Sequence, residues 1–182
     1  GELRWIVDPL DGTVNFLFGI PQFSVSVACQ DREGMVVGVV LDPVRGETFA
    51  ATRSGPPTLN GETITGSSRD DLATALVSTG FAYDAAVRAK QAVVMGRVLP
   101  RVRDIRRAGS AALDLAWLAC GRYDAYYERG VNLWDYAAGA LIASRAGLAV
   151  RDLAAADDGP AGLAAAAPAL LDELLGLILD DG

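Results

Sequence analysis

The feature that most constrains the fold is a period-two alternation near the start of the chain. Residues 23–29 alternate between bulky apolar and small side chains, and apolar runs over 35–41 and 47–52 follow after turn residues. Because every second side chain of a strand points to the same face, these segments predict three antiparallel strands. The first third of the chain is therefore expected to form an antiparallel sheet.

The remainder of the chain alternates between strand-like and helix-like patterns. Hairpins followed by such an alternation are typical of layered α/β (α+β) proteins. A length of 182 residues fits one domain. We therefore expect a single domain over 1–182, with an antiparallel-sheet half at about 1–80 and an α/β half at about 81–182. The expected strands cover 75–78, 102–106, 123–128 and 163–166, and the expected helices cover 85–99, 111–119, 133–146 and 168–179.

The composition excludes several classes of function. The chain has 23 acidic and 16 basic residues, for a net charge of −7, so no basic surface is expected to bind a nucleic acid polymer or an anionic membrane. It contains no histidine, which excludes histidine-dependent serine or cysteine catalysis and histidine-type zinc sites. Carboxylate oxygens remain as the available metal ligands.

The cysteines and the apolar stretches predict a cytoplasmic protein. Cys29 and Cys120 lie far apart, among apolar neighbours and without CxxC spacing, which indicates reduced thiols rather than a disulfide. The most apolar stretch, 162–179, contains Pro168 and two acidic residues, so we do not expect it to span a membrane. The first residues also lack the charged-then-apolar pattern of a signal peptide.

Residues 8–13, Asp-Pro-Leu-Asp-Gly-Thr, form the first candidate site. An opening strand over 4–7 is expected to stop there, because proline cannot donate a hydrogen bond to a neighbouring strand. Asp8 and Asp11, with the carbonyl of Leu10 between them, bring hard oxygen ligands to one place, as Mg²⁺ or Ca²⁺ requires. The loop is therefore a candidate metal site.

The same loop offers groups that suit an anion. The amides of Gly12 and Thr13 begin a helical turn over 14–18, and unpaired amides at the start of a helix favour a phosphate. The alternative interpretation is an Asp-Pro turn in which Asp11 and Thr13 only cap that helical turn. The spacing alone does not decide between the two.

Two further carboxylates occupy positions that suit a site. Asp135 lies in the first turn of the helix expected over 133–146, where a carboxylate also simply complements the helix dipole. Glu128 ends the strand expected over 123–128, where it either accepts hydrogen bonds from substrate hydroxyls or is a solvated strand end. Taken alone, neither position distinguishes function from structure.

Together these segments resemble the inositol monophosphatase family, the magnesium-dependent, lithium-sensitive sugar phosphatases. The resemblance covers nearly the whole chain, and its segments occur in the family's order. It implies the αβαβα sandwich of the sugar phosphatases, with the hairpin sheet packed between helices but without the N-terminal helical part. The matching segments are residues 5–16 (WIVDPLDGTVNF), 109–115 (GSAALDL), 124–128 (DAYYE) and 134–139 (WDYAAG).

The resemblance also implies an activity and a role for individual residues. The implied reaction is hydrolysis of inositol monophosphate to inositol and phosphate by a water that one Mg²⁺ activates, while a second Mg²⁺, shared through Asp8, stabilises the leaving oxygen. The expected partner is a small phosphate ester, and a homodimer is expected from the family alone. By this resemblance Asp8, Asp11, Asp135 and the carbonyl of Leu10 hold Mg²⁺, Gly12 and Thr13 hold the phosphate, Ser110, Ala111 and Glu128 contact the substrate ring, and Asp8, Asp11, Thr13 and Asp135 carry the catalysis.

The chain departs from the family pattern at its start. The family's remaining glutamate ligand belongs to a Glu-Glu segment that would precede this chain, together with N-terminal helices and a mobile loop. Glu2 is not expected to replace that ligand, because it lies on the same short strand as Asp8. We therefore expect an N-terminally truncated chain with little or no turnover by itself.

Several alternatives stay open at this point. The same chemistry on histidinol phosphate, a 3′-phosphoadenosine nucleotide or fructose bisphosphate would use the same metal ligands. A non-catalytic relative that only binds metal would keep the same scaffold. Arg106 and Arg107 either contact a second phosphate or a substrate carboxylate, or form a solvated strand end, which is the interpretation we favour.

Overall fold

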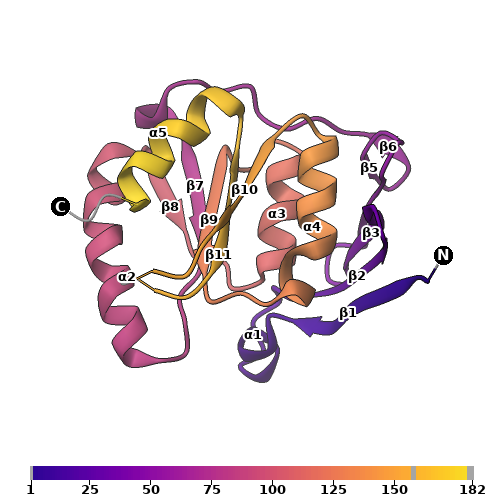
Figure 1. Cartoon of the computed structure of the whole chain (residues 1–182). Coiled ribbons are helices and arrows are strands. Elements are labelled where there is room, and N and C mark those ends of the chain that lie inside the picture. Colours follow the sequence, from indigo (N-terminus) through magenta and orange to yellow (C-terminus); the bar gives the residue numbers. More distant parts are fainter. Residues whose placement is uncertain (1, 157–158, 180–182) are drawn as a thin grey trace.

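The computed structural model describes residues 2–156 and 159–179 and shows a mixed α/β fold. Its described residues form two sheets and five α-helices, arranged in layers (Figure 1). Helices α2 (Ala85–Val98) and α5 (Pro168–Leu179) cover one sheet, and α3 (Ala111–Ala119) and α4 (Leu133–Arg145) lie between the two sheets. The layer order is therefore helices, sheet, helices, sheet.

The first sheet, called the antiparallel sheet below, contains β1 to β6 in sequence order. β1 does not stop before Pro9 as expected but continues to Asp11, with a register shift between Asp8 and Asp11. Pro9 is tolerated because β1 is an edge strand, where a missing N–H leaves no neighbour unpaired. The helical turn α1 (Thr13–Leu17) follows directly. The strands are β1 (Arg4–Asp11), β2 (Ser24–Asp31), β3 (Gly34–Asp42), β4 (Glu47–Thr52), β5 (Thr58–Leu59) and β6 (Glu62–Thr63).

The second sheet, called the mixed sheet below, has the strand order β10-β11-β9-β7-β8. β7 is parallel to β8 and β9, whereas β11 is antiparallel to β9 and β10. The sequence did not predict β10, because this edge strand carries the exposed Arg151 and Asp152 and lacks an apolar alternation. Short 3₁₀ turns cover Leu72–Thr74 and Leu99–Arg101. The strands are β7 (Leu76–Thr79), β8 (Asp104–Arg106), β9 (Ala125–Arg129), β10 (Ala149–Leu153) and β11 (Gly162–Ala166).

Helix α4 approaches its neighbours closely because its packing face is made of small residues. A Cβ atom at Gly38 on β3 would lie 2.8 Å from the carbonyl oxygen of Ala138 on α4. A Cβ atom at Gly139 would lie 2.6 Å from the Cβ of Leu115 on α3. These distances are too short for a side chain, so both positions require glycine. The close packing fixes the start of α4, and with it Asp135, relative to the antiparallel sheet and to α3.

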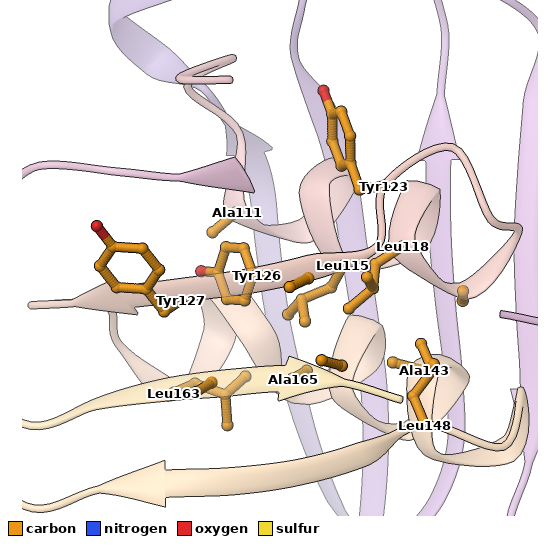
Figure 2. Close-up of a cluster of buried hydrophobic side chains, with 14 of the residues drawn as sticks. Ala111, Leu115, Leu118, Tyr123, Tyr126, Tyr127, Ala143, Leu148, Leu163 and Ala165 are labelled. Atoms are coloured by element: carbon orange, nitrogen blue, oxygen red, sulfur yellow. The ribbon is translucent and has the colours of Figure 1, made fainter. Parts of the chain in front are cut away.

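The main core lies where α3 and α4 meet the mixed sheet. Figure 2 shows part of this cluster, with Leu115 and Leu118 from α3 near Tyr126 from β9 and Leu163 from β11. All four side chains are almost completely buried. Burial of side chains of this size contributes about 2 kcal/mol each relative to exposure in water. This core holds the end of β9, where Glu128 lies, in a fixed position.

The outer face of the antiparallel sheet is apolar and open. Trp5 and Val7 on β1 are 63% and 49% exposed, and Val27 and Val39 continue the same face in register with Val7. Among the described residues, helices cover only the inner face of this sheet, so the expectation of helices on both faces is not met within them. In the same part of the chain, no helix combines the length and the apolar character that crossing a membrane requires.

Candidate active site

A cleft of about 370 Å³ opens where β1, α1, α4 and the end of β9 meet. Four of its lining side chains are acidic. Asp8, Asp11 and Asp135 lie close together, in the part called the three-acid end below, and Glu128 also lines the cleft. The cleft therefore contains every carboxylate that the sequence analysis selected, although these residues come from both halves of the chain.

The three-acid end brings together residues that are distant in sequence. Asp8 and Asp11 are on β1, and Asp135 is in the first turn of α4. One oxygen atom from each carboxylate lies within 4.8 Å of an oxygen from each of the other two. Three oxygens at such distances can share a cation, whereas three negative charges without one repel each other.

Each of these carboxylates uses one oxygen for the protein itself. The backbone N–H of Leu10 donates to Asp8 Oδ1 at 2.9 Å. The Ser110 hydroxyl and the Ala112 N–H donate to Asp11 Oδ2 at 2.6 and 2.8 Å, and the Asn132 N–H donates to Asp135 Oδ2 at 2.6 Å. These hydrogen bonds fix the three carboxyl groups and leave the other oxygen of each available to a ligand.

The turn after β1 depends on glycine and asparagine. Gly12 has φ of +87°, in the left-handed region that side chains other than glycine rarely adopt, and a Cβ there would lie 2.9 Å from the Gln22 carbonyl oxygen. Asn15 is buried and donates from Nδ2 to the carbonyl oxygens of Gln22 and Ala108 at 2.7 and 2.9 Å. Asn15 thereby ties α1 to the segment that leads into α3.

Gly12 and Thr13, the residues predicted to hold the phosphate, line the cleft next to the acids. The Thr13 hydroxyl donates to the carbonyl oxygen of Leu10 at 2.8 Å. The first backbone amides of α1 have no acceptor within the helix, as at any helix start. Ala111, predicted to contact the substrate, also lines the cleft.

Ser110 differs from its predicted role as a substrate contact. Its side chain is 1% exposed, and it does not line the cleft. Its hydroxyl donates to Asp11 and lies 3.1 Å from the hydroxyl of Ser24 on β2. Ser110 is the N-cap residue of α3, and the start of this helix is buried. From that position its hydroxyl orients the carboxylate of Asp11 and does not face the cleft.

Burial and mutual repulsion perturb the acids of the cleft. Burial raises the pKa of Asp11 to about 6, with smaller increases from the charges of Asp135 and Asp8, although the hydrogen bonds from Ser110 and Ala112 oppose the change. Burial, and after it the nearby charge of Asp8, also raises the pKa of Asp135. A bound cation would favour the ionised form of these carboxylates.

Glu128 is a half-buried residue whose carboxyl group is perturbed as well. Burial raises the pKa of its carboxyl group to about 7, while the Tyr126 hydroxyl and the positive charge of Arg107 act in the opposite direction. The Tyr126 hydroxyl donates to Glu128 Oε2 at 3.2 Å. Glu128 is therefore an ordered carboxylate at the edge of the cleft rather than the solvated strand end that the sequence left open.

Sequence reasoning missed two charged residues at or behind the cleft. Arg107, favoured as a solvated strand end, lines the cleft, because the chain turns at Gly109 and directs this segment toward α1. Asp114, which looks like an ordinary acid in the first turn of α3, is 1% exposed, and burial raises its pKa well above the usual value. No local pattern marks either residue, because the surroundings of both come from other elements.

The three-acid end fits a hard divalent cation. Its ligands are carboxylate oxygens, with the carbonyl of Leu10 in the same turn, and this set suits Mg²⁺ rather than a soft metal. One oxygen of each carboxylate lies close to one from each of the others, and the charges of Asp135 and Asp8, which add to burial in raising the pKa of Asp11, exert a repulsion that a cation would relieve. The type and the spacing of these ligand atoms therefore fit Mg²⁺.

Comparison with known proteins is consistent with this geometry. A family model described as "Inositol monophosphatase family" matches residues 1–179. The chain belongs to the inositol monophosphatase family. The inositol-1-monophosphatase SuhB of Mycobacterium tuberculosis is 46% identical over 180 residues, which cover 96% of this chain and 62% of that protein. The chain thus spans less than two thirds of the length of this relative.

Other members of the inositol monophosphatase family share the fold. The structure of Mycobacterium tuberculosis SuhB matches with a TM-score of 0.89 and 44% identity over 98% of this chain and 72% of that one. An inositol monophosphatase from Anabaena matches with a TM-score of 0.87 and 34% identity over the same shares. A relative from Escherichia coli named "Nus factor SuhB" is 43% identical over 152 residues, 83% of this chain and 57% of that protein.

Proposed function

We propose that this chain carries the site of a Mg²⁺-dependent phosphomonoesterase that hydrolyses inositol monophosphate to inositol and phosphate. The observation that carries this proposal is the convergence of Asp8, Asp11 and Asp135, each held by one oxygen and free at the other. A structural role for these acids would not require three unneutralised oxygens to face each other. The family membership supports the same activity.

The residues of the three-acid end would bind Mg²⁺ and keep its ligands oriented. Asp8, Asp11, Asp135 and the Leu10 carbonyl would hold Mg²⁺. Bound Mg²⁺ would supply a water of lowered pKa and stabilise negative charge on the phosphate and on the leaving oxygen. The Ser110 hydroxyl and the Ala112 N–H would keep the carboxylate of Asp11 oriented throughout.

The phosphate and ring sides of the cleft use different groups. Gly12 and Thr13 would face the phosphate, and Ala111 and Glu128 would face the alcohol part of the ester. Attack of water on phosphorus breaks the P–O bond to the ring oxygen, and that oxygen leaves as an inositol hydroxyl after it gains a proton. Glu128 would accept a hydrogen bond from another ring hydroxyl and so orient the ester.

The local charge explains how an acidic chain would bind a phosphate ester. The chain has a net charge of −7, which would repel the ester at long range. Cations at the three-acid end and the guanidinium of Arg107 in the same cleft would reverse the sign of the field at the phosphate. Affinity for the ester is therefore expected to depend strongly on Mg²⁺.

Other phosphate esters would use the same chemistry. Histidinol phosphate, 3′-phosphoadenosine nucleotides and fructose bisphosphate would meet the same metal ligands and differ only at the ring side of the cleft. Because the chain spans 62% of the Mycobacterium tuberculosis relative, the rate of these 182 residues alone is part of the proposal, and we expect it to be low. A comparison of kcat/KM on the four esters, in a version extended to the length of the Mycobacterium tuberculosis relative, tests the choice, and no turnover of inositol monophosphate by that version would refute it.

Calorimetric titration with Mg²⁺ tests the site separately from turnover. Asp135→Asn keeps the size of the side chain and an acceptor for the Asn132 N–H but removes one negative ligand, so Mg²⁺ affinity should fall at least tenfold. Asp172→Asn, on the exposed side of α5, is the matched control and should leave the affinity unchanged. Equal affinities in all three proteins would exclude the three-acid end as the metal site.

A further inference from the structure

The position of the Glu128 carboxylate is fixed by two neighbours outside the set of residues already assigned. Tyr126 lies two residues earlier on β9, so its side chain leaves the strand on the same face as that of Glu128. The Tyr126 side chain is fully buried among the core residues that Figure 2 shows. Its hydroxyl reaches the edge of the cleft and donates to Glu128 Oε2 at 3.2 Å. The core thus supplies a rigid donor to a carboxylate in the cleft.

Gly80 provides the second contact. It directly follows β7, and the parallel register that pairs Thr79 with Tyr127 brings Gly80 beside Glu128. A Cβ atom at position 80 would overlap the carboxylate of Glu128, including both of its oxygens. The carboxylate therefore lies directly over the Gly80 backbone, in space that only glycine leaves open.

We propose that Tyr126 and Gly80 are positioning residues that hold Glu128 against a hydroxyl of the substrate, and so select phosphate esters of polyols over esters whose alcohol part has no hydroxyl. This inference rests on the proposed phosphatase function. A carboxylate accepts about four hydrogen bonds, and Tyr126 occupies one acceptor position, so capacity for a substrate hydroxyl remains. An ordered and buried acceptor discriminates strongly, because an ester without the hydroxyl leaves it unpaired.

The test compares two substrates in a Mg²⁺-loaded version extended to the length of the Mycobacterium tuberculosis relative, since these 182 residues alone are expected to turn over slowly. Inositol 1-phosphate offers ring hydroxyls, whereas p-nitrophenyl phosphate offers none. For Tyr126→Phe, we expect KM for inositol 1-phosphate to rise on the order of tenfold, which is typical for loss of a hydrogen bond to a charged group, with kcat changed less than KM. The rate on p-nitrophenyl phosphate should change less than twofold.

Tyr127→Phe is the matched control for the tyrosine. Tyr127 is the next residue on β9 and is similarly buried, but its side chain leaves the opposite face of the strand and its hydroxyl lies near Thr79 rather than Glu128. Its removal should leave both substrates within twofold of the parent protein. A loss caused by general loosening of β9 would affect both tyrosine variants alike.

Gly80→Ala tests the second contact without removing any functional group. The overlapping atoms are the far end of the Glu128 side chain, so the variant is expected to displace the carboxylate rather than the backbone. We expect kcat/KM for inositol 1-phosphate to fall at least tenfold, with p-nitrophenyl phosphate much less affected. Gly96→Ala is the control, because a Cβ at position 96 meets no atom within 4 Å.

The outcomes separate this inference from the proposed function. Unequal losses on the two substrates for both variants, with thermal stability and Mg²⁺ affinity retained, support the positioning role. Equal losses on both substrates, or no loss for either variant, overturn it while leaving the phosphatase function in place. An extended version that carries no substitution and is inactive on both esters overturns the proposed function and this inference with it.

Discussion

Two parts of the cleft hold their carboxylates in different ways. At the three-acid end, Asp8, Asp11 and Asp135 are fixed mainly by backbone N–H groups, and one oxygen of each lies within 4.8 Å of one from each of the others. Glu128 lies outside this group and is held by a side-chain hydroxyl from the core and by the space over a glycine. The three acids need a cation to balance their charge, and Glu128 can accept a further hydrogen bond from a substrate hydroxyl.

This difference indicates what each part of the cleft controls in the reaction. Closely spaced negative oxygens suit a cation that acts on any phosphate ester, whatever its alcohol part. A single ordered acceptor in a dry position suits recognition of one hydroxyl. Changes at the three-acid end should therefore affect all substrates equally, and changes near Glu128 should affect them unequally.

The largest effect is expected from Asp11→Asn. The amide oxygen still accepts from Ser110 and Ala112, but one negative ligand is lost, so Mg²⁺ affinity and kcat/KM should fall by about 100-fold or more on every ester. Asp114→Asn is the control, because burial already favours the neutral form of that carboxyl group, and it should keep most of the activity. Selective loss on one ester after Asp11→Asn would contradict the comparison.

A smaller and selective effect is expected from Glu128→Gln. The amide keeps the shape of the side chain but accepts hydrogen bonds more weakly, so kcat/KM for inositol 1-phosphate should fall about 30-fold, in the range of a charge-assisted hydrogen bond. The fall on p-nitrophenyl phosphate should be clearly smaller. Similar falls on the two esters would assign Glu128 to the chemical step rather than to recognition.

The pKa values predict a dependence of stability on pH in the metal-free chain. The pKa is raised from 3.8 to about 6 for Asp11 and from 4.5 to about 7 for Glu128, both by burial. Between each pair of values the folded chain keeps a proton that the unfolded chain has released, so the free energy of unfolding falls as pH rises.

Urea denaturation in EDTA measures this fall. From pH 5 to pH 7 we expect a loss of about 3 to 4 kcal/mol, since one pKa unit corresponds to about 1.4 kcal/mol and Glu128 contributes more than Asp11 over this interval. In Glu128→Gln the part of the loss due to that residue should disappear. Saturating Mg²⁺ should remove most of the part due to Asp11 but not the part due to Glu128. A flat or rising profile in EDTA would contradict the burial of both groups.

The smallest effect is expected from Ser24→Ala, which acts on the three-acid end from a distance. The Ser24 hydroxyl lies 3.1 Å from that of Ser110, which in turn donates to Asp11. Loss of this buried contact should lower the free energy of unfolding by about 1 kcal/mol and Mg²⁺ affinity by a few fold. Calorimetry on the variant measures both, and an unchanged affinity would show that Ser110 orients Asp11 unaided.

The sequence predicted much of the fold because its local signals agree with the tertiary structure. The helix over 111–119 and the strand over 47–52 have the predicted boundaries. Family membership and the mixed α/β fold are likewise confirmed. The predicted end of the first strand was wrong. Proline is disfavoured only in the interior strands of a sheet, and the sequence does not show that β1 is an edge strand.

The site was predictable only where a motif marks it. The motifs selected Asp8, Asp11 and Asp135, and the structure places them together, while their roles in catalysis stay a prediction. No sequence pattern marks Tyr126 or Gly80 as functional, because a tyrosine within a strand and a glycine directly after a strand are both common. Their relation to Glu128 arises only when β7 and β9 pair side by side.

The ligands of the candidate magnesium site lie far apart in the sequence, on β1 and on α4, and these elements belong to different layers. An ion held by both would act as a reversible cross-link that closes a long loop, and loop closure restricts the unfolded chain more than the folded one. Removal of Mg²⁺ would then remove a structural cross-link as well as the ion that hydrolysis requires. The molecule would lose rigidity where its first strand meets α4.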